Sequence, residues 1–341
     1  ITADDVNLPE VIIPDADLMG VIQETLNIVP GDPITESDLA GLTELNARDA
    51  GIVDISGLQY AVNLKKLDLG VNDIEDISAL QGLTNLVDLT LQANNVTDIS
   101  SLEPLVRMEM LDIRQNNISD ISPLSSMSDL FLLLLSYNQV TDISALSSLD
   151  SLSSMDLISS GTYQVTDISS LAGLESLARL DIRGNAVTDI SALKYLNYPY
   201  LLLLSDNDIE DISPLVNNDT IDGNTTIWLG DNALELWDGS DDLEDVETLQ
   251  ARGVDIAELD PIIGNSNSEP ILLAKFEFNG SPDNSVIGGP SISLTNTSFE
   301  NQVLRTSGSY YSPSGGGGVH PEVSVSIPDL DFEAFSMEVD F

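Results

Sequence analysis

The sequence offers few side chains for catalysis. Its only histidine, His320, precedes Pro321 after a run of glycines, and the 341 residues include no cysteine. Ser-His-Asp and Cys-His mechanisms therefore lack the base or nucleophile they need. No phosphate-binding GxxxxGK(S/T) loop is present, and the 57 acidic residues contain no recognisable acid/base dyad. We predict no catalytic residues and no enzymatic activity.

Regularly spaced carboxylates are the one pattern that suggests cation chemistry. An Asp followed by Ile and Ser recurs along the chain at Asp54, Asp76, Asp98, Asp120, Asp142, Asp167, Asp189 and Asp211. Calcium takes oxygen ligands of this kind, but Asp and Ser before a short helical turn also cap its free N–H groups. We favour capping and predict neither a metal site nor a cofactor, with calcium binding as the alternative.

Charge and hydropathy limit the kinds of partner. A formal net charge of -46, from 11 basic and 57 acidic residues, repels nucleic-acid phosphates and anionic lipids. Self-repulsion of this size favours a setting that contains salt or divalent ions. No apolar run approaches the ~18 residues of a membrane span, so we predict no nucleic-acid binding and no membrane insertion. Because the sequence starts at Ile1 without Met or a hydrophobic leader, we expect a processed N-terminus and a secreted or cell-surface location.

An internal repeat supplies the elements that position these side chains. Copies ending in Asp-Ile-Ser begin at Leu67, Leu89, Leu111 and Leu133, in 22-residue steps. Further copies begin at Leu45, Met155, Leu180, Leu202 and Ile227, which makes nine, and the steps into Leu180 and Ile227 are 25 residues. Each copy fits L-x-x-L-x-L-x-x-N-x-I, the leucine-rich-repeat pattern of a strand, a turn and a loosely helical return. We predict an α/β repeat fold: a solenoid with a curved parallel sheet and a short helical or irregular convex side.

An Asn recurs where each copy leaves its strand, and we expect its amide to satisfy backbone groups inside the turn rather than to bind a ligand. The series is Asn72, Asn94, Asn116, Asn138, Asn185, Asn207 and Asn232.

Both ends of a solenoid need covers. Before the repeats, residues 15–26 have a helical apolar face, and Thr35 with Asp38 predicts a capping box at the start of a second helix. After them, a helix is expected over residues 241–251, ended by Gly253, with a closing strand over 254–256. The predicted domains are a helical N-terminal cap (1–44), the solenoid (45–237), a C-terminal cap (238–263), a linker (264–270) and an incomplete β-sandwich (271–341).

Over residues 1–261 the helical cap, the Asp-Ile-Ser repeats and the segment Arg252-Gly253-Val254 resemble bacterial internalin-like proteins. The resemblance implies a leucine-rich-repeat surface protein that binds a partner through its concave face. Residues 270–341, with alternating strands such as VSVSI from Val323, resemble the opening strands of a laminin-G or concanavalin-type jelly roll. Because such a sandwich needs two full sheets, we expect it to be completed beyond Phe341.

The concave face is predicted from strand geometry, since alternate residues of a strand point outward. Five of the chain's 11 basic residues fall on the 27 positions that flank the core pairs, and apolar residues occupy others. We predict a ligand-binding face formed by Arg48, Lys66, Met110, Asp112, Arg114, Leu132, Leu134, Asp156, Ile158, Arg179, Asp181, Arg183, Leu203 and Trp228. In the alternative, Asp and Arg on adjacent rungs neutralise one another, and the leucine runs 132–135 and 201–204 are covered by a loop or a second copy.

Apolar groups beside Arg and Trp are the composition of a protein-binding site. We therefore predict an extracellular adhesion module with a protein ligand. The alternative is a carbohydrate-binding accessory region of a secreted polysaccharide-degrading enzyme, in which Tyr198, Tyr200 and Trp228 are platforms for a surface glycan. A third hypothesis is a calcium-dependent scaffold.

Overall fold

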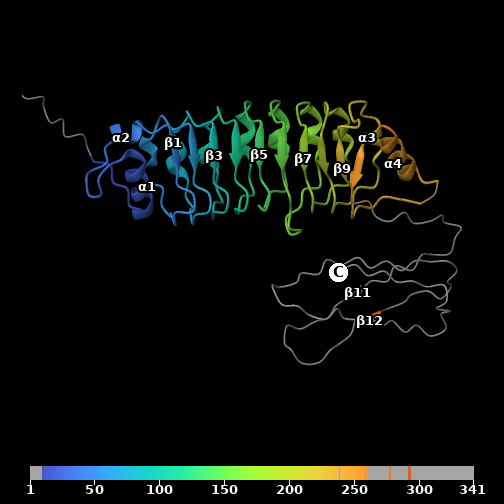
Figure 1. Cartoon of the computed structure of the whole chain (residues 1–341), viewed down its shortest axis with the longest axis horizontal. Helices are drawn as coiled ribbons and strands as arrows, with labels where there is room; N and C mark the ends of the chain where they lie inside the picture. The colour runs from blue at the N-terminus through green and yellow to red at the C-terminus, as the bar shows by residue number, and fades with distance from the viewer. Residues whose placement is uncertain (1–9, 238, 258, 260–275, 278–290, 293–341) are drawn as a thin grey trace, which may run out of the picture. The chain divides into compact units, whose positions relative to one another are not determined.

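The computed structural model describes residues 10–237, 239–257, 259, 276–277 and 291–292. The chain divides into two units, residues 1–262 and 263–341. The first unit contains ten strands that form one sheet in sequence order (Figure 1). They are β1 (Glu44–Asn46), β2 (Lys66–Asp68), β3 (Asp88–Thr90), β4 (Met110–Asp112), β5 (Leu132–Leu134), β6 (Ser154–Asp156), β7 (Arg179–Asp181), β8 (Leu201–Leu203), β9 (Thr226–Trp228) and β10 (Asp255–Ala257).

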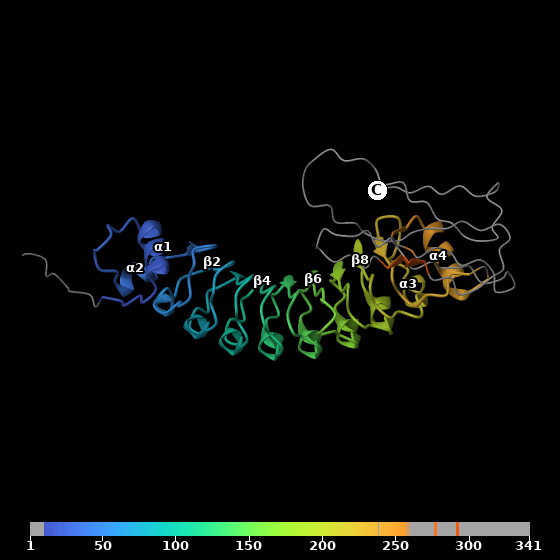
Figure 2. The ribbon, with the colours of Figure 1, turned by 90° about the horizontal axis from the view of Figure 1, so that it is seen from below.

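All strand pairs in this sheet are parallel, and the repeat sets their register. Leu67, Leu89 and Leu111 are direct partners on β2, β3 and β4, and each is at most 2% exposed. The sheet lines the concave side of the unit, and short helical turns form its convex side (Figure 2). The predicted leucine-rich-repeat solenoid is confirmed.

The convex turns begin just after the repeated Asp residues. The turns are η1 (Leu58–Tyr60), η2 (Ser78–Leu80), η3 (Ser100–Leu102), η4 (Ser122–Ser126), η5 (Ser144–Ser148), η6 (Ser169–Gly173), η7 (Ser191–Tyr195) and α3 (Ser213–Val216). Asp98 Oδ1 accepts the N–H of Ser100 at 2.8 Å, and the N–H and hydroxyl of Ser100 lower the pKa of Asp98. Asp98 thus bonds the first N–H of the turn, as predicted for Asp, but the N-cap position itself is Ile99, and no side chain caps the turn from there.

The Asn ladder holds adjacent rungs together. Asn94 Nδ2 donates to the carbonyls of Leu69 and Leu91, both at 2.9 Å, and its Oδ1 accepts the N–H of Ile74 at 3.0 Å. Asn94 is 7% exposed, and Asn72 and Asn116 make equivalent bonds. These amides satisfy buried backbone groups, as predicted.

The residue before each ladder Asn has a left-handed backbone. Non-glycine residues occupy this position at Val71, Ala93, Gln115, Tyr137, Asp206 and Asp231, with φ between 53° and 61°. In the rung of β7 the position is Gly184, with φ +74°. A Cβ there would lie 2.5 Å from the carbonyl oxygen of Ser159, in the first segment that carries extra residues.

We expect Gly184→Ala to lower the free energy of unfolding by about 2 kcal/mol, because left-handed strain adds to a clash with backbone that cannot rotate away. Urea unfolding would measure the loss. Gly173→Ala is the matched control, since a Cβ at Gly173 meets nothing within 4 Å. Equal stability of the two variants would contradict this account of Gly184.

The N-terminal cap consists of α1 (Ala16–Leu26) and α2 (Glu36–Ala40), as predicted. Asp15 caps α1 and also accepts the N–H groups of Val53 and Asp54, which joins the cap to the first rung. Burial acts to raise the pKa of Asp15, but its four backbone N–H donors outweigh burial and lower it. Thr35 and Asp38 form the predicted capping box of α2.

The C-terminal cap also follows the prediction. Helix α4 (Asp241–Ala251) has Ser240 as its N-cap, and Gly253 follows it at φ +88°. The closing strand β10 covers residues 255–257, one residue later than the predicted 254–256. Its Ile256 pairs with Ile227 of β9. None of the helices in the described part of the chain has the length and apolar character needed to cross a membrane.

In the second unit the structure describes two short strands, β11 (Phe276–Glu277) and β12 (Ser291–Ile292), which pair antiparallel. The predicted linker over 264–270 and the rest of the predicted jelly roll lie outside the described residues.

Candidate functional site on the concave face

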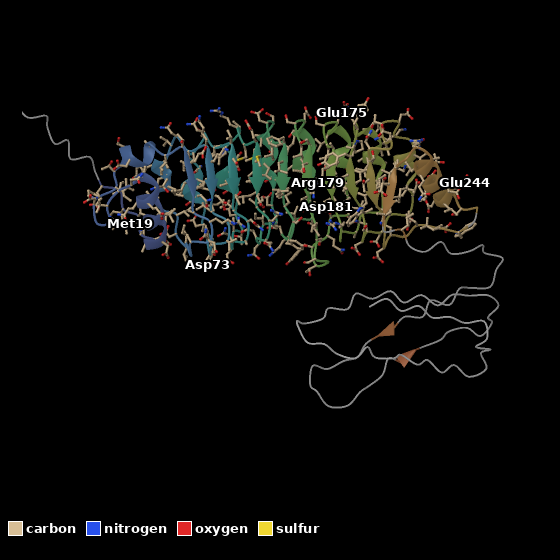
Figure 3. The ribbon with its side chains drawn as sticks, viewed as in Figure 1. Met19, Asp73, Glu175, Arg179, Asp181 and Glu244 are labelled. Carbon is tan, nitrogen blue, oxygen red and sulfur yellow. The ribbon has the colours of Figure 1, made fainter. Side chains whose placement is uncertain are left out.

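The concave face is formed by the outward residues of β1 to β9 and the residue that follows each strand by two positions. At its centre, Leu134, Asp156 and Asp181 are direct partners on β5, β6 and β7. The same row continues through Leu203 and Trp228 on β8 and β9. We call these five residues the central row. Figure 3 shows Arg179 and Asp181 in the middle of the sheet, away from Glu175 at one edge and Asp73 at the other.

Ion pairs fix three arginines on this face. Arg114 contacts Asp112 with two bonds of 2.7 and 2.9 Å, and Arg183 contacts Asp181 with two bonds of 2.9 Å. Arg179 lies 3.7 Å from the same Asp181 carboxylate. These pairs form within one rung, whereas the alternative interpretation placed the neutralising Asp and Arg on adjacent rungs. The reason is that residues two apart on a strand point to the same side. Among the ion pairs of the described residues, only that of Arg48 with Asp68, at 3.8 Å, joins adjacent rungs.

Arg183 contacts the ring of Trp228, whose partner on β8 is Leu203. The Arg183 guanidinium carbon is 5.3 Å from the centroid of the Trp228 ring, a cation–π distance. Leu203 lies in register between Asp181 and Trp228 and is only 6% exposed. The expectation that Leu203 is an exposed apolar contact is therefore wrong.

The other predicted apolar members are partly accessible. Met110, Leu132, Leu134 and Ile158 are each half-buried on β4 to β6. Arg48 and Lys66 are exposed near the start of the array, where Arg48 also donates to Gln92 Oε1 at 2.9 Å. The structure thus brings the predicted residues from β4 to β9 into one surface, with Arg48 and Lys66 at its far end.

Asp156 differs from the other acids of the face. It is 7% exposed, its Oδ1 has no hydrogen-bond partner, and it makes no ion pair among the described residues. Burial raises its pKa, and the neighbouring Asp181 raises it further, against the lowering effects of Arg179, Arg114 and the Ile158 N–H. Sequence reasoning did not anticipate this state, because spacing alone does not tell which carboxylate each arginine selects.

We expect Asp156→Asn to raise the free energy of unfolding at neutral pH by about 1 kcal/mol, the scale of an unsatisfied buried group. Because the pKa of Asp156 is higher in the folded than in the unfolded state, protonation favours the folded wild type. The free energy of unfolding of the wild type therefore increases as the pH falls through the folded-state pKa. The advantage of the variant should therefore shrink in acid. Asp112→Asn is the control and should lose stability, since it breaks the pair with Arg114. If the stability gained by Asp156→Asn grew in acid, the raised pKa of Asp156 would be contradicted.

In the described ranges of the chain, no group of three or more potential ligand side chains is placed to hold a metal ion. Calcium binding stays an untested alternative.

Known proteins match this chain mainly through its repeats. Residues 62–104 match the family described as Leucine Rich repeats (2 copies). The chain is 33% identical to an internalin C2 from Listeria monocytogenes, with a TM-score of 0.59, over 68% of this chain and 100% of that one. An internalin from the same organism is 26% identical over 78% of this chain and 100% of that one, with a TM-score of 0.41.

A more distant match shows the shared fold alone. The plant peptide hormone receptor RGFR1, solved in complex with RGF2, is 17% identical over 62% of this chain and 34% of its own, with a TM-score of 0.50. Among curated proteins, none matches the sequence.

Proposed function

The chain belongs to the internalin family of leucine-rich-repeat proteins, and from this premise we propose that its concave face binds a protein partner outside the cell. The observation that carries the proposal is the row of half-buried apolar side chains beside arginines held in place by carboxylates. Leu134 and Ile158 offer apolar surface, while Arg183 lies over Trp228. Aromatic residues and arginines with surrounding apolar contacts are the usual anchors of protein interfaces.

The arrangement is also preorganised for binding. Arg114 and Arg183 each make two bonds to a carboxylate on their own strand, so their side-chain freedom is already restricted. A partner that contacts them has less entropy to remove on binding. The regular sheet beneath them limits movement of the backbone.

We further propose that the protein is a secreted or surface-displayed adhesion module without enzymatic activity. Family membership supports this location, and the proposed jelly-roll segment over 271–341 would serve as a second adhesive domain. The concave Trp228 is a poor glycan platform, because Arg183 occupies a face of its ring.

The test is the joint replacement of Trp228 and Leu134 by Ser. The full chain would be screened by biolayer interferometry against a panel of purified extracellular domains, and each binder would be measured again with the variant. We expect at least tenfold weaker binding, about 1.4 kcal/mol or more. The control replaces Val62 and Val106, which are 44% and 46% exposed outside this face, by Ser.

A partner that binds the Trp228→Ser, Leu134→Ser variant as tightly as the wild type, with unchanged melting, would remove the concave face from the proposal. Weaker binding by the Val62→Ser, Val106→Ser control, with unchanged binding by the concave variant, would also remove the concave face from the proposal.

A further inference from the structure

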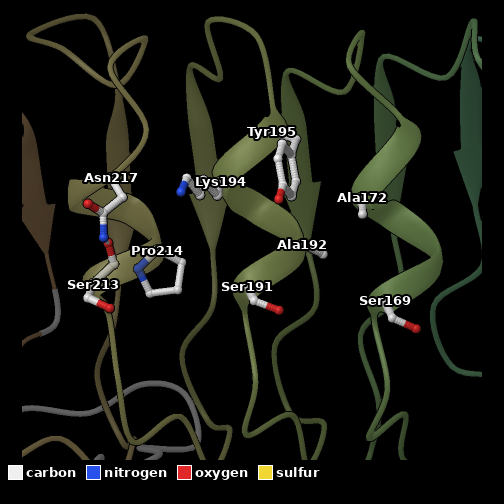
Figure 4. A pocket seen from close by; sticks show the side chains of 9 residues that line it. All are labelled: Ser169, Ala172, Ser191, Ala192, Lys194, Tyr195, Ser213, Pro214 and Asn217. Carbon is white, nitrogen blue, oxygen red and sulfur yellow. Dashed lines mark hydrogen bonds between the residues drawn. The ribbon is translucent and has the colours of Figure 1, made fainter.

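A groove of about 350 Å³ crosses the convex side between η6, η7 and α3. The polar and aromatic side chains that line it are Ser169, Ser191, Lys194, Tyr195, Ser213 and Asn217. Figure 4 shows the three serines at the start of three successive turns, with Tyr195 at the opposite end of η7. The groove lies on the outer side of the solenoid, away from the concave face.

Its lining is unusual for so acidic a chain. No carboxylate lines this groove, although the chain carries 57 acidic residues. Other grooves in the described part of the chain are lined by acids: Asp98 and Asp120 border one, and Asp142 and Asp167 border another. The groove at η6 to α3 therefore suits a ligand that needs hydroxyl, amide and amine contacts rather than a cation.

Tyr195 lines the groove, and two further exposed tyrosines, Tyr198 and Tyr200, follow it in the chain. Tyr195 is 57% exposed, Tyr198 is 73% exposed and Tyr200 is 52% exposed. They fall within six residues of sequence, in the turn that leads to β8. Exposed aromatic rings at this density have no role in the repeat core.

The turn that carries Tyr198 is held rigidly by the next rung. Tyr198 has φ +53°, a left-handed backbone for a bulky residue, and its N–H donates to Thr220 Oγ1 at 3.0 Å. Asn218 Nδ2 donates to the carbonyls of Leu193 and Leu196 at 3.1 and 2.9 Å. Asn218 and Thr220 belong to the segment that lengthens their rung to 25 residues, next to Asn217 of the groove. The extra residues thus fix the backbone of the turn that carries Tyr198.

We propose that the groove and the adjoining tyrosines bind an unbranched, uncharged glycan. The apolar faces of sugar rings stack on exposed aromatic rings, and sugar hydroxyls both donate and accept hydrogen bonds. Ser213 Oγ donates to Asp211 at 3.0 Å, so its lone pairs are left to accept from a sugar hydroxyl. Lys194 and Asn217 can donate to sugar oxygens. Because the groove spans three successive rungs, an extended chain of sugar units fits better than one compact residue.

A protein is the less suitable occupant. The core of a protein interface needs contiguous apolar surface, whereas the tyrosines here lie among Lys194, exposed Asn197 and exposed Asp219. The glycan site is separate from the proposed concave site and does not depend on it.

The test uses the full chain with cellohexaose, chitohexaose, xylohexaose and mannohexaose as probes. Binding would be detected by saturation-transfer NMR and measured by calorimetry. We expect at least one hexaose to bind, and Tyr195→Ala and Tyr198→Ala each to weaken it at least tenfold. Tyr137→Ala is the matched control, since Tyr137 is 48% exposed with φ +61° but lies in a turn that leaves the sheet at the end of β5.

Three results would overturn the proposal: no binding of any of the four hexaoses, equal weakening by Tyr137→Ala, or binding of an extracellular protein domain that needs Tyr198 while every hexaose fails. The Leu134→Ser, Trp228→Ser double variant should keep full glycan binding, which separates this site from the concave one. Circular dichroism melting would establish that each variant is folded.

Discussion

Asn94→Ala should lower the free energy of unfolding by about 3 kcal/mol. The substitution removes the amide that bonds the carbonyls of Leu69 and Leu91 and the N–H of Ile74, and it leaves these backbone groups inside the array. A buried polar group that loses its partner costs roughly 1–3 kcal/mol. Because Leu69 and Ile74 belong to one rung and Leu91 to the next, the loss weakens contacts between rungs as well as the local turn.

The adjacent residue provides the control for this variant. Asn95 has an exposed side chain, and only its backbone N–H is bonded, to Ile74. Asn95→Ala should therefore change the free energy of unfolding by less than about 0.5 kcal/mol, as is usual for a surface substitution. Urea unfolding at one pH would measure both variants. If the two losses were equal, the Asn ladder would not be a main source of stability between rungs.

The fold could be predicted from sequence because its signals are local and repeated. The period fixes which leucines face inward, and parallel stacking then places Leu67, Leu89 and Leu111 beside one another. The start of α2 followed from capping chemistry, since the structure places Thr35 at its N-cap with Asp38 as its capping-box partner. Each of these features depends on a few neighbouring residues and on backbone geometry.

The details of the concave face could not be predicted in the same way. Strand alternation indicates which residues point outward, but long arginine side chains choose among several carboxylates within reach. Two arginines contact Asp181 and none pairs with Asp156, which left one acid buried without an ion pair. Leu203 is buried because its neighbours on the strands either side cover it, and periodicity does not contain that information.

The tyrosine groove was also missed, although the sequence carried a signal. The alternative function named Tyr198 and Tyr200 as platforms for a glycan, but no role was predicted for Tyr195 or for the groove. The extra residues in the following rung were visible as a 25-residue step. Their effect on the preceding turn depends on hydrogen bonds from Asn218 and Thr220 across rungs, and such bonds require coordinates to identify.

Leu133→Ala should lower the free energy of unfolding by about 3–5 kcal/mol, the range for large cavities at fully buried leucines. Leu133 is 0% exposed and pairs with Leu111 and Met155 at the middle of the sheet. In a solenoid each rung contacts only its neighbours, so a central defect separates two stacks that can unfold independently. Both tryptophans, Trp228 and Trp237, lie after this position and report on the C-terminal stack.

Urea unfolding should therefore show one shared transition for the wild type but two separated transitions for Leu133→Ala, when tryptophan fluorescence is compared with circular dichroism of the whole array. Leu132→Ala, on the half-buried concave position next to it, should lose less than about 1 kcal/mol and keep a single transition. The two probes could instead report coincident transitions for Leu133→Ala while its free energy of unfolding falls strongly. This result would mean that the caps and the Asn ladder couple the rungs over longer distances than nearest-neighbour stacking allows.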